Sequence, residues 1–208
     1  MTCEATRPEE GRMTEVVLFH HVQGLTVGVQ AFADRLRAGG HVVHTPDLFD
    51  GARPATVEEG VALVRDVGDA VLGERTAQVL AGLPERLVVA GISWGASVAQ
   101  ELAQTRPGVG GALLYEACLP VTGEWAIGPW PAGVPVQVHG MQDDPFFGLE
   151  GDVDAARELV ESVGPDVAEL FVYPGDQHLF TDSSLPSFDA DATTLVVQRS
   201  LELLHRVA

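Results

Sequence analysis

The chain has 208 residues, of which 46% are hydrophobic and 20% are charged. This balance indicates a folded protein with a buried core and excludes general disorder, and no apolar run approaches the ~18 residues that a membrane-spanning helix needs. Acidic residues number 30 against 12 basic ones, giving a formal net charge of −18. Such a charge disfavours nucleic acids and anionic membranes as partners because like charges repel.

The N-terminal segment and the two cysteines exclude several protein classes. The first 13 residues are polar and acidic with no apolar targeting segment. Cys3 and Cys118 are too few and too far apart for a disulfide framework or a paired-cysteine metal site. We therefore expect a cytoplasmic protein in which residues 1–13 form a flexible tail and residues 14–208 form a single domain.

Alternating strand-like and helix-like patterns organise the chain from residue 15 onward. In chain order they predict a strand over 15–20, a helix over 24–38, a strand over 41–45, helical sequence over 56–83, a strand over 86–90, a helix over 96–105, strands over 111–115 and 134–139, a helix over 152–163, a strand over 168–173 and a helix over 190–207. This rhythm is typical of an α/β fold with a mostly parallel sheet, helices on both faces and right-handed crossovers.

Local signals refine two of these segments and one stretch between them. Thr56 is a suitable N-cap, and Gly68 or Gly73 is expected to break the helical sequence that follows it into two helices. The continuous apolar run over 86–90 is typical of a strand buried on both faces. Residues 116–133 hold three prolines, three glycines and two tryptophans. We expect them to form a loop over the carboxyl edge of the sheet, where ligands bind in such folds.

The sequence GISWG at residues 91–95 is the strongest chemical signal. It lies between the buried strand and a helix, the setting in which a G-x-S-x-G pattern forms a nucleophile elbow. The two glycines remove side chains that would collide in the turn, which lifts the Ser93 hydroxyl above the sheet and frees the amide of Trp94 to bind an oxyanion. An ordinary glycine-rich turn is the alternative interpretation, whereas the dinucleotide-binding pattern G-x-G-x-x-G is absent from the sequence.

Two later strands are followed by the partners that a serine nucleophile needs. One is followed by Asp143 and Asp144 and the last by His178, in the order nucleophile, acid, base that this kind of hydrolase uses. A hydroxyl is a weak nucleophile until a base takes its proton, and a carboxylate must orient that base. We expect Ser93, Asp144 and His178 to be catalytic. Asp144 is preferred over Asp143 because Pro145 restrains the chain directly after Asp144.

The histidine pair His20-His21 follows the first strand and belongs to the same edge of the sheet. A metal site built from either histidine with Asp144 and His178 is an alternative interpretation. No spacing typical of metal ligands accompanies these residues, and adjacent histidines in a strand point in opposite directions. We therefore expect no metal.

These motifs together resemble the dienelactone hydrolase family of α/β-hydrolases, in particular its compact bacterial members. The resemblance runs from residue 15 to the C-terminus and rests on FHHVQGL at 19–25, PDLF at 46–49, GISWG at 91–95, DDPF at 143–146 and YPGDQHLF at 173–180. It implies an α/β-hydrolase fold, no cofactor, and hydrolysis through a covalent acyl-enzyme. It also implies an oxyanion hole formed by the backbone amides of Val22 and Trp94, and a substrate pocket bordered by His21, Arg53, Phe146 and Phe147.

Departures from the family's pattern narrow the expected substrate. The best-known lactonases of the family have Cys where this chain has Ser93 and Glu where it has His21, and they bind a substrate carboxylate through arginines. Asp182 lies near the position of one such arginine, which leaves Arg53 as the arginine in a comparable loop. A serine nucleophile depends on its histidine base and suits ordinary esters, so we expect poor activity on dienelactone itself.

The sequence therefore predicts a serine hydrolase that cleaves small carboxylic esters or lactones and whose partner is a small-molecule substrate. Two alternatives stay open. One is a thioesterase or lactonase of the same fold, and the other is a ligand-binding homologue without turnover. The complete Ser–Asp–His set argues against the second alternative, because a binding protein does not need all three residues.

Overall fold

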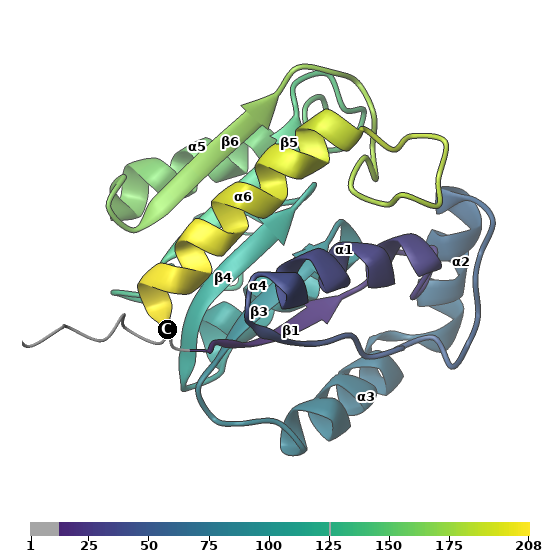
Figure 1. Cartoon of the computed structure of the whole chain (residues 1–208), viewed down its shortest axis with the longest axis horizontal. Coiled ribbons are helices and arrows are strands. Elements are labelled where there is room, and N and C mark those ends of the chain that lie inside the picture. The colour runs from purple at the N-terminus through teal and green to yellow at the C-terminus, as the bar shows by residue number, and fades with distance from the viewer. Residues whose placement is uncertain (1–12, 125) are drawn as a thin grey trace, which may run out of the picture.

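The computed structural model describes residues 13–124 and 126–208, which form a six-stranded parallel sheet with helices on both faces (Figure 1). The strand order is β2-β1-β3-β4-β5-β6. In chain order the elements are β1 (Glu15–Phe19), α1 (Val27–Ala38), β2 (Val42–His44), α2 (Val57–Val67), α3 (Asp69–Ala81), β3 (Leu87–Ile92), α4 (Trp94–Thr105), β4 (Val109–Tyr115), β5 (Val136–Met141), α5 (Asp152–Val163), β6 (Ala168–Tyr173) and α6 (Ala190–Val207). Every strand and helix expected from the sequence is present. The tail expected over residues 1–13 falls almost wholly on residues 1–12, which lie outside the described residues.

The helices divide between the two faces of the sheet. Val16 and Leu18 of β1 pack in a core layer with α1 and α6, which lie together in front of the sheet in Figure 1. Val17 and Phe19 point the opposite way, into a second layer with α3, α4 and α5. Side chains alternate along a strand, so a single strand supplies both layers.

β3 lies in the middle of the sheet, between β1 and β4, and all six of its residues are buried. This confirms the interpretation of its continuous apolar sequence. Because the sheet is parallel, the loops that follow β1, β3, β4, β5 and β6 all emerge at one edge, where ligands bind in folds of this class.

The helix boundaries follow local signals in the sequence. Thr56 caps α2, since its side-chain oxygen accepts a hydrogen bond from the amide of Glu59. Gly68, with a φ of 82°, separates α2 from α3, whereas Gly73 lies inside α3. α4 begins at Trp94, two residues earlier than the sequence predicted, because the helix starts directly after the turn at Ser93.

The chain between β4 and β5 contains no helix or strand in its described part, as its proline and glycine content predicts. The side chain of Gln100 in α4 fixes this loop by donating to the carbonyl of Leu119 over 2.8 Å and accepting from its amide over 2.9 Å. Among the described helices, none combines the length and the apolar character needed to cross a bilayer.

Candidate active site

Ser93 lies in the sharp turn between β3 and α4, at the carboxyl edge of the sheet. Its backbone has a φ of 51° and a ψ of −117°, a conformation that glycine adopts far more readily. A Cβ on Gly91 would lie 1.9 Å from the carbonyl oxygen of Gly95, and one on Gly95 would lie 2.4 Å from that of Phe19. The two glycines are therefore required where the turn folds back on itself and where α4 meets β1. The amide of Ser93 donates to the carbonyl of Tyr115 over 2.7 Å and anchors the turn on β4.

Backbone hydrogen bonds join the loop after β5 to the loop after β6. The amides of Gln142 and Asp143 donate to the carbonyls of Tyr173 and Gly175, each over 2.9 Å. These bonds continue the pairing of the two strands beyond their ends. They hold the loop that contains the predicted acid beside the loop that contains the predicted base.

The three predicted catalytic side chains form one chain of contacts. Ser93 Oγ lies 2.9 Å from His178 Nε2, and His178 Nδ1 lies 2.8 Å from Asp144 Oδ2. The Asp144 side chain is fully buried and that of His178 is 9% exposed. This geometry is that of a nucleophile in contact with a base, and of a base oriented by an acid.

Asp144, and not Asp143, contacts the histidine. The second carboxylate oxygen of Asp144 accepts hydrogen bonds from the amides of Phe146 and Phe147, at 2.8 and 3.3 Å. These two bonds fix the carboxylate, while the side chain of Asp143 is exposed and only its amide holds the loop.

Carboxyl groups around His178 raise its pKa. Burial lowers the pKa of the imidazole, but the hydrogen bond to Asp144 and the negative charges of Glu116, Asp144 and Asp152 outweigh burial. The net result is a pKa above the ordinary value for histidine. The imidazole is thus placed where it can take up a proton and hold it as a stabilised cation.

The two residues whose amides are predicted to bind an oxyanion line the same cavity as Ser93. Val22 and Trp94 line that cavity together with Ser93 and His178. Trp94 is the first residue of α4, so its amide has no acceptor within the helix. Neither amide donates a hydrogen bond to another group in the described parts of the chain.

The cavity above Ser93, which we call the Ser93 pocket, has a volume of about 350 Å³. One wall comes from α2, which presents Val57, Val61 and Val64 at helical spacing. Leu119 and Phe146 supply further apolar surface. The pocket is thus mostly apolar around the Ser93 hydroxyl, as is usual for small-molecule sites.

Three charged residues of the Ser93 pocket were not foreseen from the sequence: Arg65, Glu116 and Asp152. Burial raises the pKa of Glu116 to about 7, although the charge of His178 lowers it in part. One oxygen of Glu116 accepts from the amide and hydroxyl of Thr181, whereas Oε2 has no partner among the described residues. Burial likewise raises the pKa of Asp152 to about 6. Glu116 directly follows β4 at the carboxyl edge, and this position was the signal that could have identified it.

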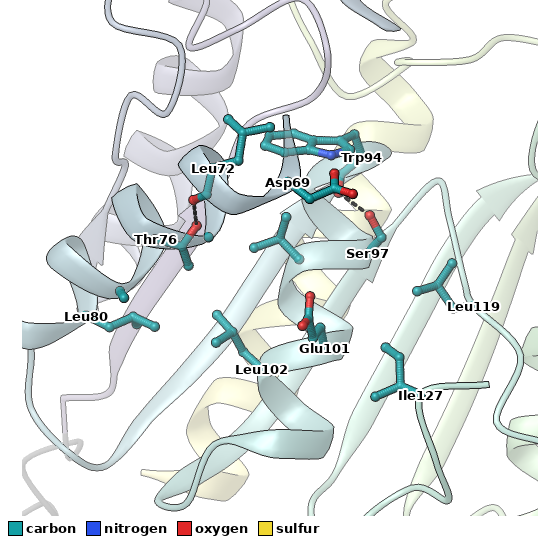
Figure 2. Close-up of a pocket in the computed structure, with 13 residues that line it drawn as sticks. Asp69, Leu72, Thr76, Leu80, Trp94, Ser97, Glu101, Leu102, Leu119 and Ile127 are labelled. Carbon is teal, nitrogen blue, oxygen red and sulfur yellow. Dashed lines mark hydrogen bonds between the residues drawn. The ribbon is translucent and has the colours of Figure 1, made fainter. Parts of the chain in front are cut away.

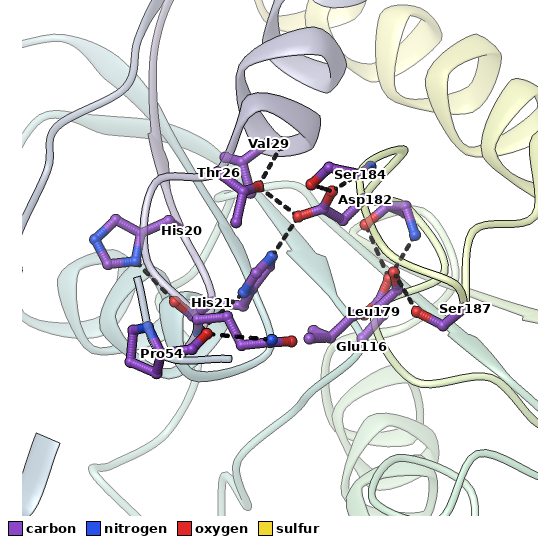
Figure 3. A network of polar contacts seen from close by, with 12 residues as sticks. His20, His21, Thr26, Val29, Pro54, Glu116, Leu179, Asp182, Ser184 and Ser187 are labelled. Carbon is purple, nitrogen blue, oxygen red and sulfur yellow. Dashed lines mark hydrogen bonds and ion pairs between the residues drawn. The ribbon is translucent and has the colours of Figure 1, made fainter. Parts of the chain in front are cut away.

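Of the four residues expected to border the pocket, the structure places only Phe146 there. His21 is fully buried, and its Nε2 lies 2.8 Å from Asp182 Oδ2 in the polar network of Figure 3. Arg53 pairs with Asp47 at 2.9 Å. Phe147 is fully buried against Gly140, where a Cβ would lie 2.1 Å from its ring.

Both ring nitrogens of His20 form hydrogen bonds inside the protein. Its Nδ1 lies 2.8 Å from the carbonyl oxygen of His21, and its Nε2 accepts a hydrogen bond from the amide of Leu48. Burial lowers the pKa of His20 to about 4, so the ring is neutral near pH 7. In the described ranges no three His, Cys, Asp or Glu side chains gather as a candidate metal site.

The fold matches solved hydrolase structures at low sequence identity. A provisionally assigned dienelactone hydrolase from Klebsiella pneumoniae subsp. pneumoniae aligns with a TM-score of 0.72 and 21% identity, over 95% of this chain and 90% of that one. A dienelactone hydrolase-like promiscuous phosphotriesterase from metagenomic libraries aligns with a TM-score of 0.73 and 20% identity, over 96% and 88% of the two chains. Esterase 2 from Thermogutta terrifontis gives 0.63 and 16%, over 98% and 87%. At these identities the similarity shows an α/β-hydrolase fold and nothing finer.

Sequence comparison places the chain in a family. No curated protein sequence matches it. A family model, however, matches all of residues 1–208, and its description agrees with the fold of the structural neighbours. The chain belongs to the dienelactone hydrolase family.

Proposed function

We propose that this protein is a carboxylic-ester hydrolase with Ser93 as nucleophile, His178 as general base and Asp144 as the acid that orients the histidine. The observation that carries the proposal is the continuous contact from Ser93 Oγ through His178 to Asp144, with distances of 2.9 and 2.8 Å. Membership of a hydrolase family supports the same reaction class.

In the first half of the reaction, His178 Nε2 takes the Ser93 proton while Oγ attacks the acyl carbon. The amides of Val22 and Trp94 donate to the oxygen that becomes negative. Asp144 stabilises the imidazolium, which then gives its proton to the departing alkoxide. An acyl group on Ser93 and a free alcohol result.

In the second half, His178 removes a proton from water as the water oxygen attacks the acyl-enzyme. Collapse of the second tetrahedral intermediate returns the proton to Ser93 Oγ and releases the carboxylic acid. The apolar pocket, with two carboxyl groups of raised pKa, suits an uncharged small-molecule ester. A cytoplasmic location, as expected from the sequence, is part of the same proposal.

A fluorophosphonate probe tests the proposal directly, because it phosphonylates an activated serine. We expect one adduct on Ser93 in the wild-type protein, and neither adduct nor hydrolysis of p-nitrophenyl acetate in Ser93→Ala. The melting temperature of this variant should stay near that of the wild type, since one hydroxyl is removed. A folded wild-type protein that forms no adduct would instead be a ligand-binding homologue.

A further inference from the structure

A second cavity lies next to the Ser93 pocket. It is a groove of about 560 Å³ lined by α3, by α4 and by the loop after β4. Figure 2 shows Leu72, Thr76 and Leu80 of α3 on one side and Leu119 and Ile127 of the loop after β4 on the other. We call this cavity the α3–α4 groove.

The α3–α4 groove adjoins the Ser93 pocket. Trp94, Ser97 and Leu119 line both cavities. Gln100 fixes Leu119 through two hydrogen bonds, so the shared wall is held in place. The two cavities therefore share a wall, and a ligand bound at Ser93 would reach the groove by passing Trp94.

The surface of the groove is less polar than its residue types suggest. The hydroxyl of Thr76 donates to the carbonyl of Leu72 over 2.9 Å, and the hydroxyl of Ser97 donates to the carbonyl of Trp94 over 2.6 Å (Figure 2). Both hydroxyls are thus satisfied within their own helices. Apolar side chains supply most of the remaining surface: Leu72, Leu80, Val98, Leu102, Leu119 and Ile127.

The charges of the groove are all negative. Asp69 and Glu101 line it, and none of its described lining residues is basic. A carboxylate in the groove would be repelled and would lose its hydration without a partner. The groove therefore suits an uncharged apolar chain.

The position of His178 determines which part of an ester faces the groove. His178 lines the Ser93 pocket and does not line the groove, whereas Trp94 lines both. The leaving alcohol must face the histidine that protonates it. The acyl part then lies on the side of Trp94, toward the groove.

We propose that the α3–α4 groove binds the distal part of an unbranched, uncharged acyl chain, so that the substrate class is medium-chain acyl esters. This inference rests on the hydrolase proposed above and adds a subsite to it. Burial of a methylene is worth about 0.8 kcal/mol, so each one that enters the groove raises kcat/KM by roughly two- to fourfold, the lower figure applying in a partly open groove.

The experiment compares p-nitrophenyl acetate with p-nitrophenyl octanoate at concentrations below micelle formation. In the wild-type protein we expect kcat/KM to be at least about tenfold higher for the octanoate. Gly73 lines the groove inside α3, and a Cβ there meets no other heavy atom within 4 Å. Gly73→Trp should fill the groove and lower the octanoate-to-acetate ratio by roughly fivefold or more.

Two further variants separate groove filling from other effects. Ala77→Trp blocks the same groove from the next turn of α3 and should lower the ratio in the same way. Gln78→Trp adds the same side chain to an exposed position of α3 outside both cavities, and should leave the ratio within about twofold of the wild type. Melting curves verify that all variants are folded.

The outcomes are distinct from those of the proposed function. Loss of acetate hydrolysis and of phosphonylation in the wild-type protein would overturn the hydrolase itself. Normal acetate hydrolysis with no preference for octanoate, or with equal ratios in Gly73→Trp and Gln78→Trp, would overturn the subsite. A ratio that depends on the alcohol chain, measured with octyl and ethyl acetate, would contradict its assignment to the acyl part. Equal rates for the octanoate and the corresponding ester with a terminal carboxylate would contradict its apolar selectivity.

Discussion

Ser93 has a backbone conformation that costs free energy for any residue with a side chain. Its φ of 51° and ψ of −117° lie where glycine is favoured, and such strain is worth about 1–3 kcal/mol. The strain is the cost of projecting Oγ toward His178. Stability and activity therefore make opposite demands on this one position.

Replacing Ser93 with glycine and with alanine separates these demands. Both variants should be inactive, because both lack the hydroxyl that we propose as the nucleophile. We expect Ser93→Gly to be more stable than Ser93→Ala by about 1 kcal/mol, or about 2–4 °C in melting temperature, after the greater freedom of unfolded glycine is subtracted. Thermal unfolding measures the difference. Equal melting temperatures would show that the turn is relaxed with a side chain in place.

The two neighbouring aspartates after β5 should differ greatly in their effect on catalysis. Asp144→Asn removes the charge that orients His178 and should lower kcat by about 10³–10⁴, the loss seen when the acid of a serine protease is neutralised. Asp143→Asn is the matched control. Its side chain is exposed, so the loss should be about tenfold or less. The reverse order would mean that the loop has another register during catalysis.

Glu116 should influence the pH dependence of the reaction through its charge. A negative charge near His178 raises the pKa of the imidazole, and the unprotonated imidazole is the base in the proposed reaction. Glu116→Gln removes this charge, so the acid limb of kcat/KM against pH should move to lower pH. The charges of Glu116 and His178 each shift the pKa of the other, so the acid limb of the wild-type profile reports the titration of both groups. The control is Glu74→Gln, at an exposed position of α3, which should leave the acid limb at the wild-type pH. An acid limb that does not move in Glu116→Gln would show that the charge of Glu116 does not act on His178.

At the scale of elements, Asp182 connects the loop after β1, the start of α1 and the loop after β6. Its Oδ2 accepts from His21 and Thr26, and its Oδ1 accepts from the amide and hydroxyl of Ser184 (Figure 3). A Cβ on Gly28 would lie 1.6 Å from Oδ1, so only glycine lets α1 approach this carboxylate. The network holds the segment that presents the amide of Val22.

Neutralising Asp182 should destabilise the protein in a pH-dependent manner. Burial alone raises the pKa of Asp182, but the hydrogen bonds from His21, Ser184 and Thr26 lower it to about 2. The folded pKa lies below the unfolded value, so the stabilisation is complete above pH 4 and is lost as the pH falls toward 2. Asp182→Asn should lower the free energy of unfolding by about 2 kcal/mol at pH 7 and by less at pH 3. Urea unfolding at both values measures this, and a loss independent of pH would contradict the linkage.

Elements with signals inside their own sequence could be predicted. The contacts of Ser93, His178 and Asp144 could be predicted as well, because each residue follows a strand in the chain order that this fold uses. Contacts between elements that no motif marks could not be predicted. The apolar run of β3 and the cap at Thr56 depend on neighbours in the chain, and both were expected. The turn at Ser93 was also foreseen, because two glycines must stand beside it. The sequence predicted that either Gly68 or Gly73 separates α2 from α3. The backbone conformation shows that the residue is Gly68.

Most residues that line the Ser93 pocket could not be predicted from the sequence. His21 and Arg53 were expected there, but each is paired with a carboxylate from elsewhere in the fold. The valines of α2 form a regular apolar stripe, yet a stripe does not reveal whether it faces a strand or a cavity. Arg65 lines the pocket because α2 packs over the pocket. The position of α2 depends on tertiary contacts, which the sequence of the helix does not reveal.

At the scale of the whole molecule, the negative net charge of the protein disfavours negatively charged substrates. The formal net charge is −18, and the Ser93 pocket adds Glu116 and Asp152 to this background. Arg65 is the one arginine among the described residues that line the pocket. The surrounding potential therefore opposes the approach of an anionic substrate.

We expect dienelactone, which carries a carboxylate, to be a poor substrate compared with a neutral short-chain ester. The comparison is of kcat/KM for the two compounds at low ionic strength, where repulsion is least screened. Added salt should reduce the difference in kcat/KM between the two compounds, because it screens the repulsion. A value for dienelactone about tenfold above that of the neutral ester would refute the argument, and Arg65→Gln would then show whether that arginine binds the carboxylate.

His178 follows β6, an edge strand that pairs with β5 alone, whereas Ser93 follows the buried central strand β3. Edge regions of a sheet open locally at a lower free energy than its centre, and an opening at β6 would move His178 away while Ser93 stays in place. We therefore expect local fluctuations of the β6 edge to limit the proposed reaction, so that amide hydrogen exchange in β6 follows activity more closely than global unfolding does. Substitutions that stabilise this edge should then raise the share of molecules competent for the proposed reaction even where they leave global stability unchanged.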